Sequence, residues 1–146
     1  MDRDFSPLDD YLAESDLDGY LLDDGSDLSN QLYLSGFDAE DPFITLYTPG
    51  TTALLTSTLE YTRATEESRA DQVFRFSDFD YREKIEEHGR EAARRMVLVS
   101  FLEQFDVGAV GANRRFPLFT ADGLREREVA VEPDLDDVLE DIRAIK

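Results

Sequence analysis

The sequence has no cysteine, one histidine and only two lysines among its 146 residues. Without cysteine the chain forms no disulfide and offers no thiolate ligand to a metal ion. No run approaches the roughly 18 to 20 apolar residues of a membrane-spanning helix. The first residues, Met1 to Pro7, have neither the basic end nor the apolar core of a signal peptide. These absences predict a soluble protein of the cytoplasm.

Basic residues are few in comparison with acidic ones: fifteen against thirty-four, which leaves a net charge of −19. The aspartates are scattered along the chain rather than gathered in a tail. Spread like charge repels itself in dilute buffer, whereas at molar salt the screening length falls to about 3 Å and the repulsion largely disappears. The composition therefore indicates a halophilic protein. It argues against nucleic acid as a partner, because phosphate binding depends on lysine and arginine.

Apolar patterns divide the chain into alternating strands and helices, and its length fits one domain. Six strands are predicted at residues 19–22, 43–47, 52–56, 72–76, 107–112 and 129–131. Helices are predicted from residue 6 and at residues 27–34, 58–68, 77–105 with a break at Gly89, 116–124 and 134–145. This alternation predicts an α/β, three-layer domain with a roughly six-stranded sheet, which is mixed because the second and third strands form a hairpin.

Single residues mark where these elements begin, end and bury their faces. Ser6 is expected to cap the first helix, with Pro7 at its first position. Gly36 is expected to end the second helix, and residues 48–51 to form the hairpin turn. The residues expected in the core are apolar and central to their elements: Leu54, Phe101 and Val110.

Candidate catalytic residues are few. His88 lies in a charged helical stretch and is interpreted as a surface residue. Residue order leaves a Ser-His-Asp triad open, although no G-x-S-x-G motif is present. Asp23, Asp24 and Asp78 follow or end strands, where a magnesium site of the nuclease kind needs its acids, but twenty aspartates make such placement common. The residues alone therefore indicate no complete active site.

Two segments carry a resemblance to a known family. The first is Asn30-Gln31-Leu32-Tyr33-Leu34-Ser35-Gly36-Phe37, which resembles the N-x-x-Y-L-T/S-G-F signature of the creatinase/prolidase N-terminal domain. The second is Ile142-Arg143-Ala144-Ile145-Lys146, which is similar to the R-x-I/V-K segment that precedes the catalytic domain in that family. The resemblance covers residues 1–146 as one N-terminal domain with a ribonuclease H-like sheet. With the acidic composition, it implies a member from a halophilic archaeon.

The resemblance also implies a division of labour with a second domain. In creatinases, Xaa-Pro dipeptidases and Xaa-Pro aminopeptidases the catalytic "pita-bread" domain follows this one, and it is absent from this chain. The peptidases hold two divalent metal ions there, Mn, Co or Zn. No catalytic or metal-binding residue is therefore expected in this chain, and the domain alone is expected to be inactive. The partners implied are its own catalytic domain, a second copy in a homodimer, and short proline-containing peptides.

The same resemblance assigns two groups of residues. Asn30, Tyr33, Gly36 and Phe37 of the signature are expected to be structural. The loop after them is expected to lie near the substrate of a neighbouring subunit through Asp38, Glu40 and Asp41, although a merely solvated loop is the alternative. For the whole chain the alternatives are a stand-alone binding or scaffolding module and a carboxylate-metal nuclease.

Overall fold

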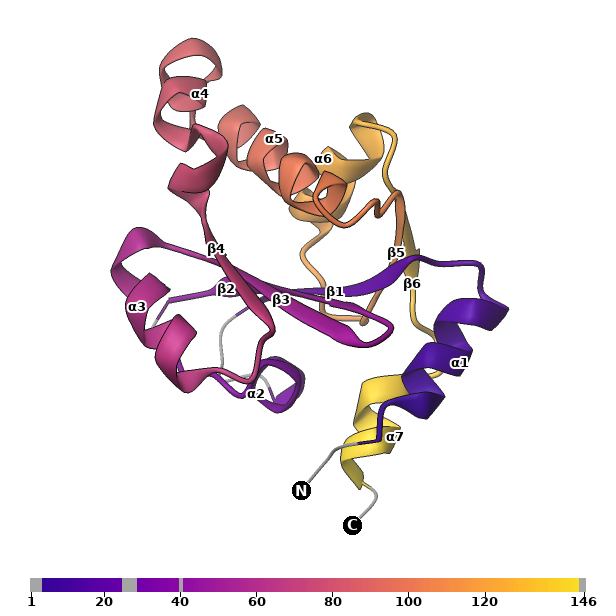
Figure 1. Ribbon diagram of the computed structural model, residues 1–146. Coiled ribbons are helices and arrows are strands. Elements are labelled where there is room, and N and C mark those ends of the chain that lie inside the picture. The colour runs from indigo at the N-terminus through magenta and orange to yellow at the C-terminus, as the bar shows by residue number, and fades with distance from the viewer. Residues whose placement is uncertain (1–3, 25–28, 40, 145–146) are drawn as a thin grey trace.

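The computed structural model describes residues 4–24, 29–39 and 41–144, which form an α/β domain built on one six-stranded sheet (Figure 1). The strand order is β4-β3-β2-β1-β5-β6. The strands are β1 (Gly19–Asp24), β2 (Phe43–Thr48), β3 (Thr51–Thr56), β4 (Gln72–Arg75), β5 (Ala109–Ala112) and β6 (Ala130–Pro133). Strand β2 is antiparallel to both its neighbours, and the other adjacent pairs are parallel. Five strands therefore end at the same edge, called here the carboxyl edge.

Helices cover both faces of this sheet, so the predicted three-layer α/β class is confirmed (Figure 1). One face, the upper one in Figure 1, is called here the front face. It carries η1 (Phe76–Phe79), α4 (Tyr81–His88), α5 (Arg90–Glu103) and α6 (Leu118–Glu126). The back face carries α1 (Ser6–Glu14), α2 (Ser29–Ser35), α3 (Thr58–Glu67) and α7 (Val138–Ala144). Within the described residues no helix has the length and apolar character needed to cross a membrane.

Side chains of the central strands alternate between the two faces, as a strand requires. In β1, Leu21 belongs to the front core, whereas Tyr20 and Leu22 belong to the back core. All three are 0% exposed, which explains why β1 is continuously apolar rather than alternating. The predicted core residues Leu54, Phe101 and Val110 are also 0% exposed, so that prediction is confirmed.

Aromatic rings fill the front core where α5 crosses the sheet. The ring of Phe101 lies 5.7 Å from Phe105, 5.8 Å from Phe74 and 6.4 Å from Phe79, each in an edge-to-face arrangement. Such pairs add to the stabilisation that burial of the rings already gives. Phe101 is thus the centre of the front core.

Glycines end two elements as predicted. Gly36 follows α2 with a φ of 66°, and Gly89 separates α4 from α5 with a φ of 87°. Both values lie in the left-handed region that favours glycine. The predicted hairpin is also present, because β2 pairs with β3 through Thr48 opposite Thr51.

Two predicted helix starts are wrong for local reasons. Ser6 does not cap α1: Phe5 holds the cap position, and the Ser6 N–H donates to Asp4 Oδ1 at 2.9 Å. The last helix begins at Val138 rather than at residue 134. Asp134 instead lies four residues before the helix, and its buried Oδ2 accepts the Val138 N–H at 2.9 Å. The cap predicted at Asp27 for the second helix lies outside the described residues.

Candidate functional site

Asn30 joins helix α2 to the C-terminal helix α7. Its Nδ2 donates to Glu140 Oε1, and its Oδ1 accepts from Arg143 Nε at 2.8 Å. Asn30 is largely buried, and a buried amide needs such partners. Asn30 and Arg143 come from the two sequence segments singled out above, 113 positions apart. The two segments therefore meet directly in the fold.

Gln31 makes a second buried connection, one that the sequence analysis did not identify. It is 0% exposed. Its Nε2 donates to the carbonyl oxygen of Phe43 at 2.6 Å, and its Oε1 accepts from Thr45 Oγ1 at 2.5 Å. Gln31 thereby holds α2 against strand β2. The available signal in the sequence was the position of Gln31 one helical turn before Ser35. Ser35 is also buried, and its Oγ donates to the Gln31 carbonyl oxygen at 2.7 Å.

The remaining signature residues act through packing and backbone shape. Tyr33 packs partly buried against the back core. At Gly36 a Cβ atom would lie 2.6 Å from Arg69 Cγ, so the close approach of this side chain requires glycine in addition to the positive φ. Phe37 is buried, and its ring lies 5.5 Å from that of Phe43. Together they fix the chain where it leaves α2.

The loop after the signature lies beside helix α3. Arg63 on α3 donates from Nη2 to the carbonyl oxygen of Asp38 at 3.1 Å, and its guanidinium lies 5.4 Å over the ring of Phe37. Asp38 and Asp41 are exposed. Glu40 lies outside the described residues. Asp38 and Asp41 are therefore exposed to solvent, while the buried Phe37 and the hydrogen bond from Arg63 hold the start of the loop in place.

At the carboxyl edge, a buried ion pair joins the sheet to the front helices. Asp23 of β1 is 5% exposed. Its Oδ1 accepts from Arg94 Nη2 of α5 at 2.9 Å, and its Oδ2 accepts from Thr120 Oγ1 of α6 at 2.7 Å. A buried carboxylate is stable only when paired in this way. Asp23 is thus committed to Arg94 and Thr120.

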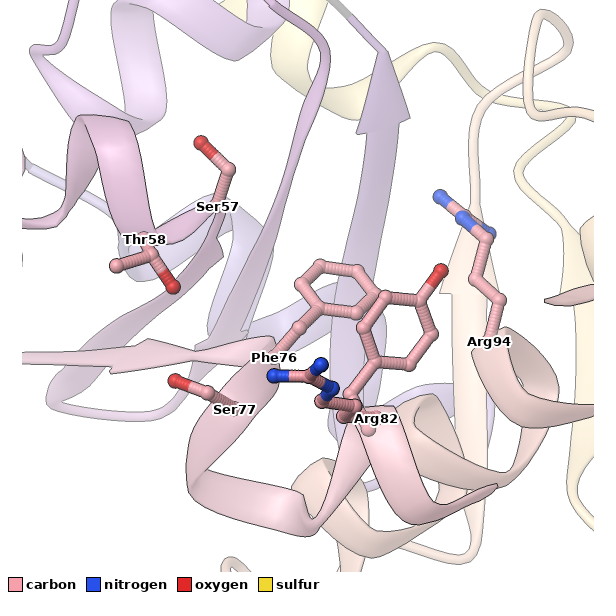
Figure 2. Close-up of a pocket in the computed structure, with 7 residues that line it drawn as sticks. Ser57, Thr58, Phe76, Ser77, Arg82 and Arg94 are labelled. Carbon is pink, nitrogen blue, oxygen red and sulfur yellow. The ribbon is translucent and has the colours of Figure 1, made fainter. Parts of the chain in front are cut away.

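A pocket of about 360 Å³ opens beside this ion pair (Figure 2). Its walls come from the start of α3, from η1, from the first turn of α4 and from α5. The lining residues are Ser57, Thr58, Phe76, Ser77, Tyr81, Arg82 and Arg94. The pocket combines aromatic rings, hydroxyl groups and two guanidinium groups.

Two other acids, Asp78 and Asp24, were considered as metal ligands, and Asp78 is bound to an arginine. Arg75 binds Asp78 through Nη2 and Nε, at 2.8 and 3.2 Å from Oδ1. Partial burial alone would raise the pKa of Asp78, but the hydrogen bonds from Arg75 outweigh it and hold this pKa below its usual value. The side chain of Asp24 is not described. In residues 4–24, 29–39 and 41–144, no three histidine or acidic side chains are grouped to hold a metal ion.

His88, the single histidine, lies at the end of α4. Its side chain is 46% exposed, and its Nε2 lies 3.6 Å from Glu87 Oε2. This placement agrees with its interpretation as a surface residue.

The mixed sheet, together with the contact between the two sequence segments through Asn30 and Arg143, defines a class of protein. The sequence profile of the Creatinase/Prolidase N-terminal domain matches residues 6–145. The chain therefore belongs to the creatinase/prolidase N-terminal domain family, as the two segments predicted. No curated protein sequence matched the chain.

Solved structures with the same fold come from Xaa-Pro peptidases. The prolidase from Pyrococcus furiosus matches with a TM-score of 0.68 and 20% identity, over 98% of this chain and 38% of that one. The prolidase from Pyrococcus horikoshii matches with a TM-score of 0.67 and 21% identity, over 96% and 34%. A proline dipeptidase from Streptococcus pneumoniae matches with a TM-score of 0.65 and 20% identity, over 99% of this chain and 100% of that one.

The chain thus spans little more than a third of the two prolidases that it resembles. In this family the metal ions belong to the catalytic domain. The described residues do not fit a two-metal centre, because Asp23 and Asp78 are held by arginines and no further acids gather around them.

Proposed function

We propose that this chain is the non-catalytic N-terminal domain of a metal-dependent Xaa-Pro peptidase. The observation that carries the proposal is the family match over residues 6–145, which covers nearly the whole chain. The hydrogen bond between Asn30 and Arg143 supports it. This bond fixes helix α7, and α7 leads to the position where the family continues into its catalytic domain.

The domain contributes two things to the intact peptidase in this proposal: contacts between subunits, and recognition of one end of the substrate. The loop of Asp38, Glu40 and Asp41 supplies the second. Loops held at both ends by a rigid scaffold commonly carry binding residues. Here Phe37 before the loop and Phe43 after it are both buried. The exposed carboxylates of Asp38 and Asp41 have the charge to attract the free α-amino group of a short peptide.

The test uses the full-length protein that carries this domain, assayed with an Xaa-Pro dipeptide at one fixed high salt concentration. Asp38→Asn, Glu40→Gln and Asp41→Asn are made singly. At least one should raise KM several-fold with little change in kcat, the pattern expected when binding is lost equally from ground and transition states. High salt screens long-range effects, so a change in KM reports a close contact.

The matched control is Asp10→Asn, which removes an exposed aspartate of α1 far from the loop in sequence. It should leave both constants unchanged. If all three loop variants keep wild-type KM and kcat, the loop is only solvated and substrate recognition by this domain is wrong. If the reading frame downstream of the domain does not encode a catalytic domain with residues that hold the two metal ions, the stand-alone module replaces the peptidase proposal.

A further inference from the structure

The pocket at the carboxyl edge has the position of a ligand site. Strands β3 and β4 are parallel neighbours, and both end beside it. In open α/β sheets, ligands bind outside the carboxyl ends of the strands. The pocket volume of about 360 Å³ lies within the range of small-molecule sites. The substrate recognition proposed for the loop of Asp38, Glu40 and Asp41 does not involve this pocket.

The floor of the pocket is aromatic. The rings of Phe76 and Tyr81 lie 5.1 Å apart at an interplanar angle of 60°. Figure 2 shows the Phe76 ring at the centre, with the hydroxyl groups of Ser57, Thr58 and Ser77 on one side. Such a floor favours a ligand with an apolar or aromatic body, because burying that body removes apolar surface from water.

The two arginines of the lining differ in how they are held. Arg94 is fixed by its bonds to Asp23 and Thr120, and a guanidinium has five N–H donors, so several remain for a ligand. Arg82 is exposed and has no ion pair or hydrogen bond with any part of the chain that the structure describes. In Figure 2 the two arginines lie on different sides of the rings, Arg82 beside Ser77 and Arg94 at the opposite side.

The charge of the lining is positive in a chain whose net charge is −19. Two arginines and no acidic residue stand among the described residues of the lining. Of the two arginines, Arg94 is bonded to a carboxylate, that of Asp23, which is itself buried. A guanidinium matches a carboxylate in shape and charge. A ligand ammonium group would find no carboxylate in this lining.

We propose that this pocket binds a small organic carboxylate that has an apolar or aromatic body and no ammonium group. The carboxylate binds Arg82, the body lies on Phe76 and Tyr81, and Arg94 adds positive charge at the other side of the pocket. The site is separate from the loop of Asp38, Glu40 and Asp41, which is proposed to meet the opposite charge. Its test is therefore independent of the peptidase proposal.

The experiment titrates the ¹⁵N-labelled chain with N-acetylphenylalanine and follows backbone amide shifts. The salt concentration is fixed at a value where circular dichroism shows the chain folded. The amides of Ser77, Tyr81 and Arg82 should shift and saturate. N-acetylphenylalaninamide has the same body without the charge and should bind about tenfold more weakly, since it loses a charge-assisted contact. Free phenylalanine and inorganic phosphate should also bind more weakly.

Substitutions locate the binding. Arg82→Gln should weaken N-acetylphenylalanine about tenfold, and because Arg82 is exposed it should not disturb the fold. Arg90→Gln is the matched control: Arg90 is exposed on the same face but does not line the pocket, so its substitution should change nothing. The proposal is overturned if the amide binds as well as the acid, if Arg82→Gln binds like wild type, or if phosphate binds as tightly as N-acetylphenylalanine.

Discussion

The two faces of the sheet bury cores of different chemistry. The front core under α5 and α6 is a hydrocarbon cluster centred on Phe101, and its buried ion pair, Asp23 with Arg94, lies at the carboxyl edge. The back core contains polar groups that are satisfied internally: the Tyr20 hydroxyl donates to Asp134 Oδ2 at 2.8 Å, and the Tyr47 hydroxyl donates to Asp9 Oδ1 at 2.7 Å. A hydrocarbon core depends on volume, whereas a core with ionisable groups also depends on pH. The faces should therefore respond to different perturbations.

Charge is divided between these regions as well. Residues 81–127, which include α4, α5 and α6, contain nine basic and eight acidic residues. The other ninety-nine residues contain six basic and twenty-six acidic residues, so nearly all of the net charge lies there. Repulsion therefore acts mainly outside the front helices. This division leaves the front the better surface for an anionic ligand.

The largest effect should come from salt, if the protein is halophilic as its composition indicates. Thermal melts followed by circular dichroism from about 0.1 to 3 M KCl should show Tm rising steeply, because screening removes the repulsion between the scattered carboxylates. NaCl at equal ionic strength should give the same rise, since screening does not depend on which of these cations is used. A Tm unchanged across this range would contradict the halophilic interpretation.

The next effect concerns the front core alone. Phe101→Ala should lower the free energy of unfolding by about 3 to 5 kcal/mol, because it removes a fully buried ring and leaves a cavity among three other phenylalanines. Guanidinium denaturation at fixed pH measures it. Leu59→Ala is the control, because Leu59 is 89% exposed and should change stability by less than about 0.5 kcal/mol. A loss below about 1 kcal/mol for Phe101→Ala would show that the front core tolerates the cavity and that its centre is misplaced.

The sequence predicted the fold well because its signals are local. Short apolar or alternating runs gave all six strands, and Gly36 and Gly89 adopt the positive φ that their positions indicated. Errors occurred where a carboxylate competes for backbone N–H groups. The Asp4 carboxylate accepts the N–H of Ser6, and the Asp134 carboxylate accepts the N–H of Val138, where helix α7 begins. Among twenty aspartates, nothing local distinguishes these two.

The candidate site was less accessible to sequence reasoning, because its contacts join distant parts of the chain. Asp23 and Arg94 are 71 positions apart, and Asp23 and Thr120 are 97 apart. Neither pairing follows from spacing, and Asp23 was considered only as a metal ligand. The signature was recognised as a motif, but its buried Gln31 occupies a variable position of that motif. Only the fold shows that this amide is bound on both sides.

The smallest effect separates the faces by pH. Burial, together with the charge of Asp134 and the hydrogen bond to it, raises the pKa of Tyr20, and burial and neighbouring carboxylates raise the pKa of Tyr11 to about 12. In the unfolded chain tyrosine ionises near pH 10. The stability that comes from the neutral hydroxyl groups is therefore complete below about pH 10. It falls as the pH rises from there toward the folded pKa values, because only the unfolded chain then releases protons.

Tyr20→Phe tests this on the back face. It removes the hydroxyl that donates to Asp134, while the N–H groups of Asp136 and Val138 still hold that carboxylate. At pH 8 the free energy of unfolding should fall by about 1.5 to 3 kcal/mol, the range for a hydrogen bond to a charged group. Between about pH 10 and 11.5, stability should decline less steeply than in wild type, by about 1.4 kcal/mol per pH unit for the missing tyrosine. Phe101→Ala should keep the wild-type decline, because it changes no ionisable group. Equal alkaline slopes in Tyr20→Phe and wild type would show that Tyr20 ionises alike in the folded and unfolded chain, and the distinction between the two cores would then be lost.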